Sequence, residues 1–193
     1  MRTDRRRQKI RTVLEHRQND LTVVLEDIHD PHNVSAILRT ADAVGVREVQ
    51  VVYKRERFPP IGKKSSASAW KWVTRRKFRS LEDCYSRLRE EGYKIFASQL
   101  NSGSTSLFDL DLSRKVALVF GNEHLGVSSE AGALADGRFM IPMYGMIESL
   151  NVSVACAVAL YEALRQRLGE GKYSKPNLAA PIVQTLVEEW SRK

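Results

Sequence analysis

The chain has 193 residues, the length of one domain with room for terminal extensions. Its 31 Lys and Arg residues outnumber its 23 Asp and Glu residues, and the formal net charge of +8 at pH 7 favours a polyanionic partner, nucleic acid above all. A basic surface that binds nothing is the alternative. Two cysteines and no long apolar run exclude a disulfide framework and a membrane-spanning helix. The histidines are scattered, so we expect no metal site, and we expect a cytoplasmic protein without a membrane partner.

Residues 1–20 are rich in basic side chains and carry the apolar period of a helix. Ile10, Val13 and Leu14 form a thin apolar stripe on this segment. The basic side chains around the stripe are Arg2, Arg5, Arg6, Arg7, Lys9, Arg11 and Arg17. So many cations on one short segment favour an arm that contacts phosphates, and a solvated helix is the alternative.

Predicted strands alternate with predicted helices along the rest of the chain. The strands are expected at Leu21–Glu26, residues 49–53, Lys94–Ser98, Val116–Phe120 and residues 139–143. The helices are expected at residues 34–44, 81–91, 128–135 and 152–168, with a last amphipathic helix within residues 173–193. Asn33 is expected to cap the first of these helices, and Gly45 to end it. Because the strands are continuous apolar runs, the sequence predicts an α/β fold with a mostly parallel sheet covered by helices on both faces.

The loops that follow these strands are the expected ligand sites, because ligands gather at the carboxyl ends of parallel strands. Four such loops cover residues 27–33, 98–106, 121–126 and 144–151. Gly121 and Gly126 allow the backbone to approach a ligand closely, and the Ser149-Leu150-Asn151 triplet offers capping groups at the mouth of a helix. Neither a phosphate-binding P-loop nor a dinucleotide fingerprint occurs, which excludes the common nucleotide cradles and a dehydrogenase of that type.

One helix face carries a second candidate group. Ser35, Arg39 and Asp42 recur at i, i+4 and i+7, so they share the face opposite the apolar stripe of their helix. From spacing alone, a surface ion pair between Arg39 and Asp42 explains the pattern as well as a functional site does. Glu123, taken alone, is a polar loop residue.

Three segments considered together identify a family resemblance. They are NVSAILRTAD at residues 33–42, VFGNEHLGV at residues 119–127, and IPM at residues 141–143 followed by SLNVSVA at residues 149–155. In order and spacing they resemble the three motifs of the SpoU/TrmH branch of the SPOUT RNA 2′-O-methyltransferases, and the likeness extends over nearly the whole chain. The resemblance implies a deep trefoil knot in the C-terminal part of the sheet, S-adenosylmethionine bound in that knot, and a homodimer in which both subunits supply catalytic groups.

The resemblance also assigns roles to individual residues. Arg39 would activate the ribose 2′-hydroxyl, Asn33 would orient Arg39 or the substrate, and Asn151 would help to hold Arg39 or the ribose phosphate. The catalytic set is Arg39, Asn33, Glu123, Ser149 and Asn151; the cofactor set is Ser98, Leu100, Gly121, Ile141, Met143 and Leu150; the RNA phosphate set is Arg6, Lys9, Arg11, Arg17, Arg165 and Arg167. Because arginine stays protonated in proteins, we expect Arg39 to position the substrate and stabilise the developing alkoxide, while a phosphate or a water takes the proton.

The extensions at residues 1–20 and 171–193, around a domain at residues 21–170, look like those of family members that methylate a D-loop guanosine of tRNA. The leading interpretation is therefore an S-adenosylmethionine-dependent tRNA 2′-O-methyltransferase. A different tRNA position, ribosomal RNA, and a non-catalytic RNA-binding protein are the alternatives. The predicted loop at residues 54–69 lacks the Gly-Ser-His run of close relatives within the SpoU/TrmH branch, which leaves the substrate open among these alternatives. Trp70 and Trp72 near the end of the loop either pack in the core or stack on bases.

Overall fold

The computed structural model describes residues 4–54, 58–59 and 68–193. The predicted loop at residues 54–69 lies mostly outside this range, as does Arg2. Within the described part of the chain, no helix is long and apolar enough to cross a membrane, and no group of His, Cys, Asp and Glu side chains has the arrangement of a metal site.

The sheet has the strand order β3-β2-β1-β6-β4-β7-β5, and every neighbouring pair is parallel. Its strands are β1 Leu21–Glu26, β2 Glu48–Val52, β3 Thr74–Phe78, β4 Lys94–Ser98, β5 Thr105–Ser106, β6 Val116–Phe120 and β7 Gly137–Met140. Every residue of the central strands β1 and β6 is buried, as expected for strands with helices on both faces. The predicted parallel α/β sheet is confirmed.

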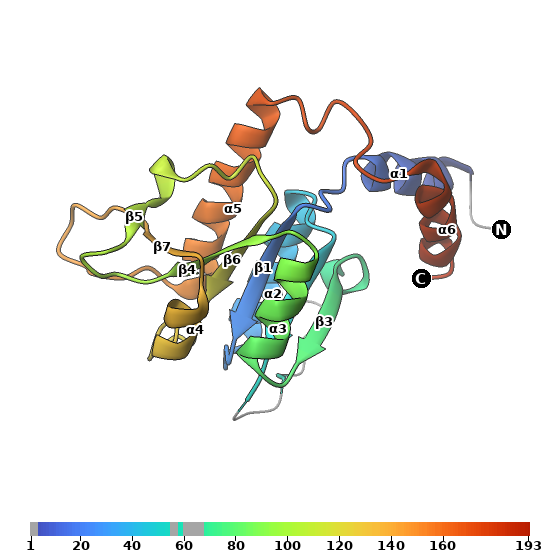
Figure 1. The fold of residues 1–193 in the computed structure, drawn as a ribbon. Helices are drawn as coiled ribbons and strands as arrows, with labels where there is room; N and C mark the ends of the chain where they lie inside the picture. The colour runs from blue at the N-terminus through green and yellow to red at the C-terminus, as the bar shows by residue number, and fades with distance from the viewer. Residues whose placement is uncertain (1–3, 55–57, 60–67) are drawn as a thin grey trace.

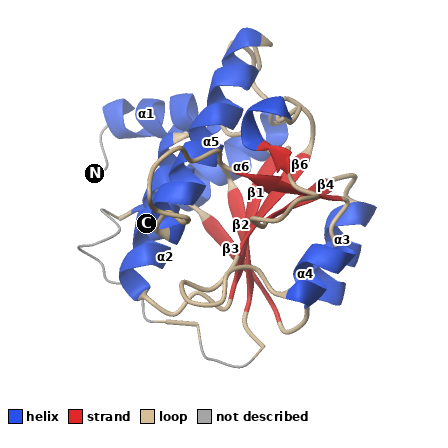
Figure 2. Ribbon diagram, turned by 90° about the vertical axis from the view of Figure 1, so that its left-hand side faces the viewer, coloured by secondary structure: helices blue, strands red, loops and turns tan. Residues whose placement is uncertain are grey.

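Helices cover both faces of the sheet (Figures 1 and 2). They are α1 Asp4–Glu15, α2 Pro31–Ala43, α3 Leu81–Glu90, α4 Ser129–Leu134, α5 Val152–Gly169 and α6 Ala180–Ser191, with short 3₁₀ turns η1 Ala69–Lys71 and η2 Leu107–Asp109. Ile37 of α2 and Leu160 of α5 belong to the core on one face, and Leu81 of α3 and Ala131 of α4 to the core on the other. The predicted layers are therefore present.

Helices α1 and α6 pack together beside the sheet, although they lie at opposite ends of the chain (Figure 1). Ile10 and Leu14 of α1 meet Val183, Val187 and Trp190 of α6 in an apolar cluster of their own. Two residues of the thin apolar stripe on the basic N-terminal helix, Ile10 and Leu14, are thus buried by the C-terminal helix, whereas Val13 stays exposed.

Two local predictions about α2 were wrong. The helix is capped by Asp30 rather than Asn33, because the Asp30 carboxylate accepts from the backbone N–H of His32 over 2.8 Å and Pro31 starts the helix. Ser35 does not share an exposed face with Arg39: its side chain is fully buried. Asp42 pairs with Arg17 rather than with Arg39.

The two edge strands, β3 and β5, were missed, and β7, which lies next to an edge, was misplaced. Strand β3 has the sequence TRRKF, and all of its residues are exposed or half-buried, so no apolar pattern predicts it. The two-residue strand β5 lies at the end of a segment predicted to be a loop, and β7 ends at Met140 although the apolar run continues to Met143. The residues from Ile141 to Asn151 lie outside helix and strand.

Candidate active site

Glu123 is the centre of a hydrogen-bonded chain at the carboxyl edge of the sheet. It lies in the loop after β6, and its carboxylate accepts from the backbone N–H groups of His29 and Asp30, each over 3.0 Å, and from Nδ2 of Asn33 over 2.9 Å. The Oδ1 atom of Asn33 accepts from Nδ2 of Asn151 over 3.1 Å. Three of the predicted catalytic residues, carried by three separate segments, therefore meet.

The surroundings of Glu123 keep its carboxylate ionised. Burial acts to raise the pKa of Glu123, but the hydrogen bonds from Asn33 and from the backbone of His29 and Asp30 outweigh it and hold the pKa below the ordinary value. Because both carboxylate oxygens accept from N–H donors, the side chain acts as a clamp between loops and is a poor choice for a proton acceptor.

Asn151 also begins helix α5. Its Oδ1 atom accepts from the backbone N–H of Ser153 over 2.9 Å and from the Ser153 hydroxyl over 2.6 Å, which makes Asn151 the N-cap. The amide oxygen thus fixes the start of the helix while the amide nitrogen holds Asn33. A single asparagine couples the position of α5 to that of α2.

A cavity of about 170 Å³ lies beside these hydrogen-bonded residues, between the loop that follows β4 and the loop that enters α5. Its lining is Ser98, Gln99, Leu100, Met140, Ile141, Met143, Glu148, Ser149, Leu150 and Ala155. This set includes five of the six residues predicted to bind the cofactor and the predicted catalytic residue Ser149. The other four lining residues, Gln99, Met140, Glu148 and Ala155, were missed, and their only sequence signal is that they lie in or beside the segments that hold the predicted residues.

The lining suits a ligand with an apolar and a polar end. Leu100, Ile141 and Leu150 supply apolar surface, whereas the Ser98 and Ser149 hydroxyls and the Glu148 carboxylate supply polar groups. Residues 141–151 lie outside helix and strand, so their backbone N–H and C=O groups can serve a ligand. These groups fit the adenine, hydroxyl and amino groups of S-adenosylmethionine.

Gly121 does not line the cavity, but its lack of a side chain shapes the loop after β6. A Cβ atom at Gly121 would lie 2.1 Å from the carbonyl oxygen of Gly126, far inside van der Waals contact. The loop closes on itself there through a backbone hydrogen bond of 2.8 Å from Gly126 to Asn122. Glycine at position 121 is therefore required by the turn that holds Glu123.

Arg39 stands apart from these groups. Its side chain is exposed, and among the described residues it has no hydrogen-bond or ion-pair partner. Arg39 lies six positions after Asn33 on α2, which corresponds to about 9 Å along the helix axis. Within one polypeptide, Arg39 therefore does not contact the hydrogen-bonded residues Glu123, Asn33 and Asn151.

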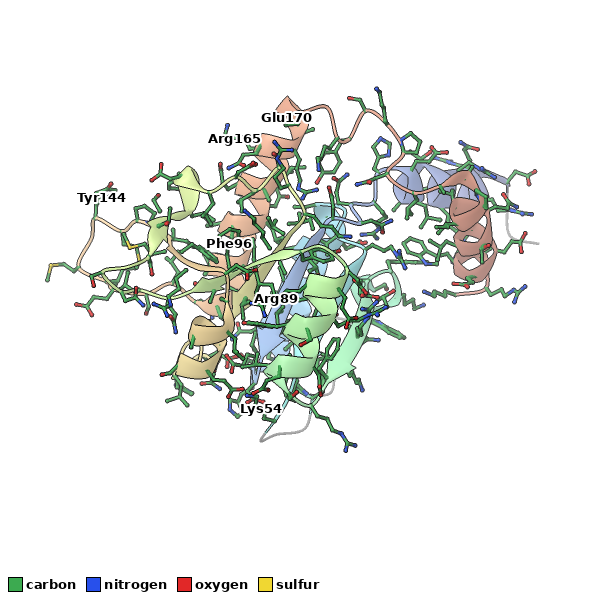
Figure 3. The ribbon with its side chains drawn as sticks, viewed as in Figure 1. Lys54, Arg89, Phe96, Tyr144, Arg165 and Glu170 are labelled. Atoms are coloured by element: carbon green, nitrogen blue, oxygen red, sulfur yellow. The ribbon has the colours of Figure 1, made fainter. Side chains whose placement is uncertain are left out.

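Four of the six predicted RNA contacts are accessible to a polyanion. Arg6, Lys9 and Arg11 are exposed or half-buried on α1, and Arg11 donates to Oε1 of Gln184 on α6 over 2.9 Å. Arg165 lies on α5 (Figure 3). Its side chain is 70% exposed and pairs with Glu162. These four remain predicted RNA contacts.

The other two, Arg17 and Arg167, were predicted wrongly, because both side chains are 0% exposed. Arg17 donates to Asp42 and to the carbonyl oxygen of Val46. Arg167 donates to Asp20 and to four further oxygen acceptors inside the molecule, those of Gln18, Leu112, Arg114 and the Asp20 backbone. Their guanidinium groups hold the fold together and cannot reach a phosphate.

Known proteins resemble the chain along its full length. A model of the SpoU rRNA Methylase family matches residues 20–161. A tRNA (guanosine(18)-2′-O)-methyltransferase of Thermus thermophilus is 46% identical over 192 residues, which are 100% of this chain and 98% of the relative.

Solved structures share the fold. The crystal structure of the Aquifex aeolicus TrmH/SpoU tRNA modifying enzyme has a TM-score of 0.93 and 38% identity, covering 98% of this chain and 96% of that one. The SpoU methyltransferase AviRb of Streptomyces viridochromogenes, solved in complex with the cofactor AdoMet, has a TM-score of 0.69 and 28% identity, covering 80% of this chain and 62% of that one.

Proposed function

This chain belongs to the SpoU methylase family, and on that premise we propose that it transfers a methyl group from S-adenosylmethionine to the ribose 2′-hydroxyl of a D-loop guanosine in tRNA. The observation that carries the proposal is the 46% identity to a tRNA (guanosine(18)-2′-O)-methyltransferase over essentially the full length of both chains. The likeness thus includes the two terminal helices α1 and α6, which lie outside the residues that the family model matches.

The cavity of about 170 Å³ is the proposed cofactor site. Leu100, Ile141 and Leu150 would enclose the adenine, and the loop before α5 would supply backbone groups to it. When bound, S-adenosylmethionine supplies an electrophilic methyl group on a sulfonium, so the protein has to provide an aligned oxygen nucleophile and a route for its proton.

Arg39 and the Asn33–Asn151 pair would position the ribose. The guanidinium of Arg39 presents several donors in a fixed plane and stays charged, so it would hold the nucleotide and stabilise the alkoxide as the 2′-oxygen loses its proton. Asn33 is held in place by Glu123 on one side and Asn151 on the other. The proton would go to a phosphate oxygen or a water, since the Glu123 carboxylate is occupied by N–H donors.

We also propose that the active unit is a homodimer built on helix α5. Val154, Tyr161 and Leu168 are spaced seven residues apart on α5 and are 47%, 54% and 57% exposed, so they form an apolar stripe along one face. The loop before α5 adds Tyr144 and Met146, which are almost fully exposed, and Tyr144 projects from the tip of this loop (Figure 3). A second copy of the chain would cover this surface.

The isolated position of Arg39 supports the same arrangement. Because Arg39 has no partner among the described residues of its own chain, its guanidinium is free to reach the cofactor cavity of the other subunit. The trefoil knot is a further part of this proposal: the segment from β6 to α5 would be threaded as in the SPOUT fold, which would bring the Gly121 loop and the residue 141–151 loop to one cofactor.

The decisive experiment measures methyl incorporation from radiolabelled S-adenosylmethionine into an unmodified tRNA transcript, for the wild type and for Arg39→Ala, followed by nucleoside mapping. We expect 2′-O-methylguanosine in the D-loop with the wild type and its loss in the variant. A wild-type protein that binds the cofactor but labels only ribosomal RNA would overturn the substrate assignment and leave the reaction. Absence of transfer to either RNA would overturn the enzyme proposal.

A further inference from the structure

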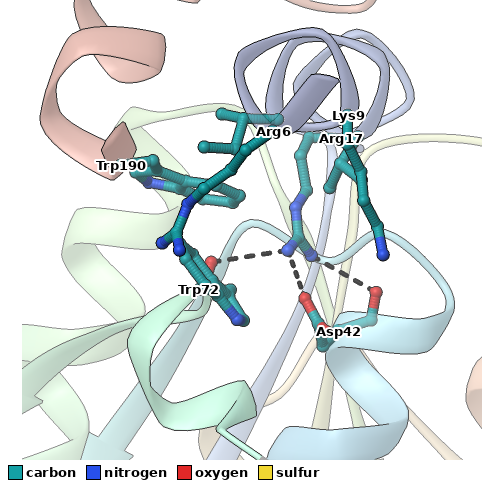
Figure 4. Close-up of a pocket in the computed structure, with 8 residues that line it drawn as sticks. Arg6, Lys9, Arg17, Asp42, Trp72 and Trp190 are labelled. Atoms are coloured by element: carbon teal, nitrogen blue, oxygen red, sulfur yellow. Dashed lines mark hydrogen bonds and ion pairs between the residues drawn. The ribbon is translucent and has the colours of Figure 1, made fainter. Parts of the chain in front are cut away.

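A second and larger cavity lies beyond the amino edge of the sheet, away from the candidate active site. It has a volume of about 380 Å³ and is lined by Arg6, Lys9, Ile10, Val13, Arg17, Asp42, Trp72 and Trp190 (Figure 4). Nothing in the proposed chemistry uses this cavity. Its size is that of a pocket for one small molecule or one nucleotide, too small for a helix or a strand of a partner protein.

Five separate segments build the cavity. Helix α1 supplies its upper rim, the loop between α1 and β1 supplies Arg17, and the last turn of α2 supplies Asp42. The turn before β3 and helix α6 supply the two tryptophans. Each of these segments lies where a strand begins or where a helix returns to the start of the sheet. The candidate active site lies where the strands end, so the two sites are separated by the length of the sheet.

One wall of the cavity is apolar and aromatic. Ile10 and Val13 of α1 face Trp72 and Trp190, whose ring centroids are 5.1 Å apart with an angle of 47° between the ring planes. Trp72 is half-buried and keeps part of its surface in the cavity, whereas Trp190 is held more deeply. A flat, apolar ligand face would find matching surface here.

The rest of the lining is cationic. Arg6 and Lys9 point from α1 into the space between the tryptophans and Asp42 (Figure 4). The buried guanidinium of Arg17 forms the floor, 5.2 Å from the centre of the Trp190 ring. Arg17 and Asp42 neutralise each other as an ion pair, so the exposed side chains of Arg6 and Lys9 supply the positive charge that selects an anionic ligand.

The floor is rigid before any ligand arrives. The guanidinium of Arg17 donates hydrogen bonds to the Asp42 carboxylate and, over 2.8 Å, to the carbonyl oxygen of Val46, and these bonds fix its position. Its buried Nε atom has no hydrogen-bond partner among the described residues. The cavity therefore combines a fixed buried guanidinium, an aromatic wall and two exposed cations at its rim. These groups form a preorganised binding site.

We propose that this cavity binds one unpaired nucleotide of the RNA substrate, distinct from the nucleotide that is methylated. The base would lie against the wall of Trp72 and Ile10, and the phosphate would contact Arg6 and Lys9. Stacking on an aromatic side chain requires an unstacked base, so the site selects single-stranded RNA over a helix. A free phosphate would use the cations and leave the apolar wall uncovered. The identity of the polymer as RNA rests on the proposed function.

The first test uses variants that are matched in charge. Arg5, Arg6, Arg7 and Lys9 all lie on α1, but only Arg6 and Lys9 line the cavity. We expect Arg6→Gln and Lys9→Gln each to weaken tRNA binding roughly tenfold, because each loses a charge-assisted hydrogen bond. Arg5→Gln and Arg7→Gln lose the same charge without that bond and should weaken binding about twofold. Equal losses in all four variants would overturn the proposal in favour of diffuse attraction.

The second test follows the tryptophans directly. The chain has three tryptophans, so Trp70→Phe leaves Trp72 and Trp190 as its emitters. A pentauridylate oligoribonucleotide should quench this emission in the Trp70→Phe protein, and the quenching should be lost when Arg6→Gln is added. Inorganic phosphate at the same phosphate concentration should not displace the oligonucleotide. No quenching, or full displacement by phosphate, would overturn nucleotide binding.

The two tests separate this proposal from the function on which it rests. Oligonucleotide quenching requires no methyl transfer, so it can succeed or fail whether or not the wild type methylates tRNA. If tRNA is methylated and no quenching is seen, the cavity proposal alone fails. If quenching is seen and neither tRNA nor ribosomal RNA is methylated, the proposed function alone fails.

Discussion

Asn33 donates a hydrogen bond from Nδ2 to Oε1 of Glu123 over 2.9 Å, although the two residues are 90 positions apart in the chain. This bond joins the first turn of α2 to the loop that follows β6. Its amide oxygen accepts from Asn151, so the start of α5 is fixed to the same point. The geometry of the candidate site therefore depends on one carboxylate that gathers three segments.

Glu123→Gln should weaken the hydrogen bonds of the candidate site while keeping the size of the side chain. The carboxylate accepts three N–H donors, whereas a glutamine amide offers one oxygen and turns an NH₂ group toward a donor. We expect a loss of roughly 1–3 kcal/mol in the free energy of unfolding, measured by urea denaturation. Methyl transfer should fall along with it, because Asn33 loses its support. A variant as stable and active as the wild type would show that the clamp is dispensable.

The same residue predicts a pH dependence. The pKa of Glu123 is lowered from its ordinary value of 4.5, so the folded state binds the proton less tightly than the unfolded chain does. Its contribution to stability is complete above pH 4.5 and is lost as the pH falls through the lowered folded value. The stability difference between wild type and Glu123→Gln should therefore be constant near neutral pH and shrink in acid. A difference that grows on acidification would contradict this sign.

Arg39 should matter for turnover and not for folding. Its side chain is exposed and has no partner among the described residues, so Arg39→Ala should leave the urea midpoint unchanged. We expect kcat to fall roughly 10²–10³-fold, as for the loss of a charge-stabilising donor. Arg39→Lys keeps the charge and loses the planar fork, so it should recover only a small part of the rate. Near-normal turnover by Arg39→Lys would rule out a need for the guanidinium.

Apolar pattern was enough to predict the middle of the sheet. The strands Lys94–Ser98 and Val116–Phe120 lie where the sequence places them, because a strand covered on both faces has to be continuously apolar or nearly so. The edge strand β3 has one neighbour and polar side chains, so hydropathy carries no signal for it. The lining of the proposed cofactor cavity was partly predictable from motif order, since five of its residues, Ile141, Met143, Ser149, Leu150 and Ala155, belong to the segments that carry the resemblance.

Charge pattern misled where burial depends on distant partners. The sequence predicts that Arg17 belongs to an exposed basic arm. It is buried instead, because Asp42, 25 positions away, accepts its hydrogen bond. The sequence predicts that Arg167 is an exposed cation of α5. It is buried instead, because Asp20, 147 positions away, accepts its hydrogen bond. Neither pairing can be inferred from one sequence, because it depends on how the helices return to the sheet.

Arg165 and Arg167 allow the structural and RNA-binding roles of cations on α5 to be separated. Arg167→Ala leaves the carboxylate of Asp20 and several carbonyl groups without their donor, so unfolding should become easier by about 3–5 kcal/mol. Arg165→Ala should leave the urea midpoint close to that of the wild type, because the side chain is 70% exposed, and should weaken tRNA binding. The reverse result would restore Arg167 as an RNA contact.

Tyr161→Glu should break the proposed dimer. Tyr161 lies in the middle of the apolar stripe on α5, and a carboxylate there would be buried without a partner against the second copy. Sedimentation equilibrium should show a dimer dissociation constant raised at least roughly a hundredfold. Ile182→Glu is the matched control, since Ile182 is 45% exposed on α6, away from the stripe. A wild-type protein that sediments as a monomer would contradict the proposed interface.

Gly121→Ala should disturb the loop after β6 more than the addition of one methyl group suggests. The added Cβ would lie 2.1 Å from the carbonyl oxygen of Gly126, so the backbone of the turn has to move, and with it Asn122 and Glu123. We expect a loss of roughly 1–3 kcal/mol in the free energy of unfolding. Calorimetric titration should also show weaker S-adenosylmethionine binding. Gly103→Ala is the control, because the nearest atom to its Cβ lies at 3.6 Å in an exposed loop, an ordinary contact. If both variants bind the cofactor as the wild type does, the close approach at Gly121 serves the fold alone and the cofactor does not depend on that turn.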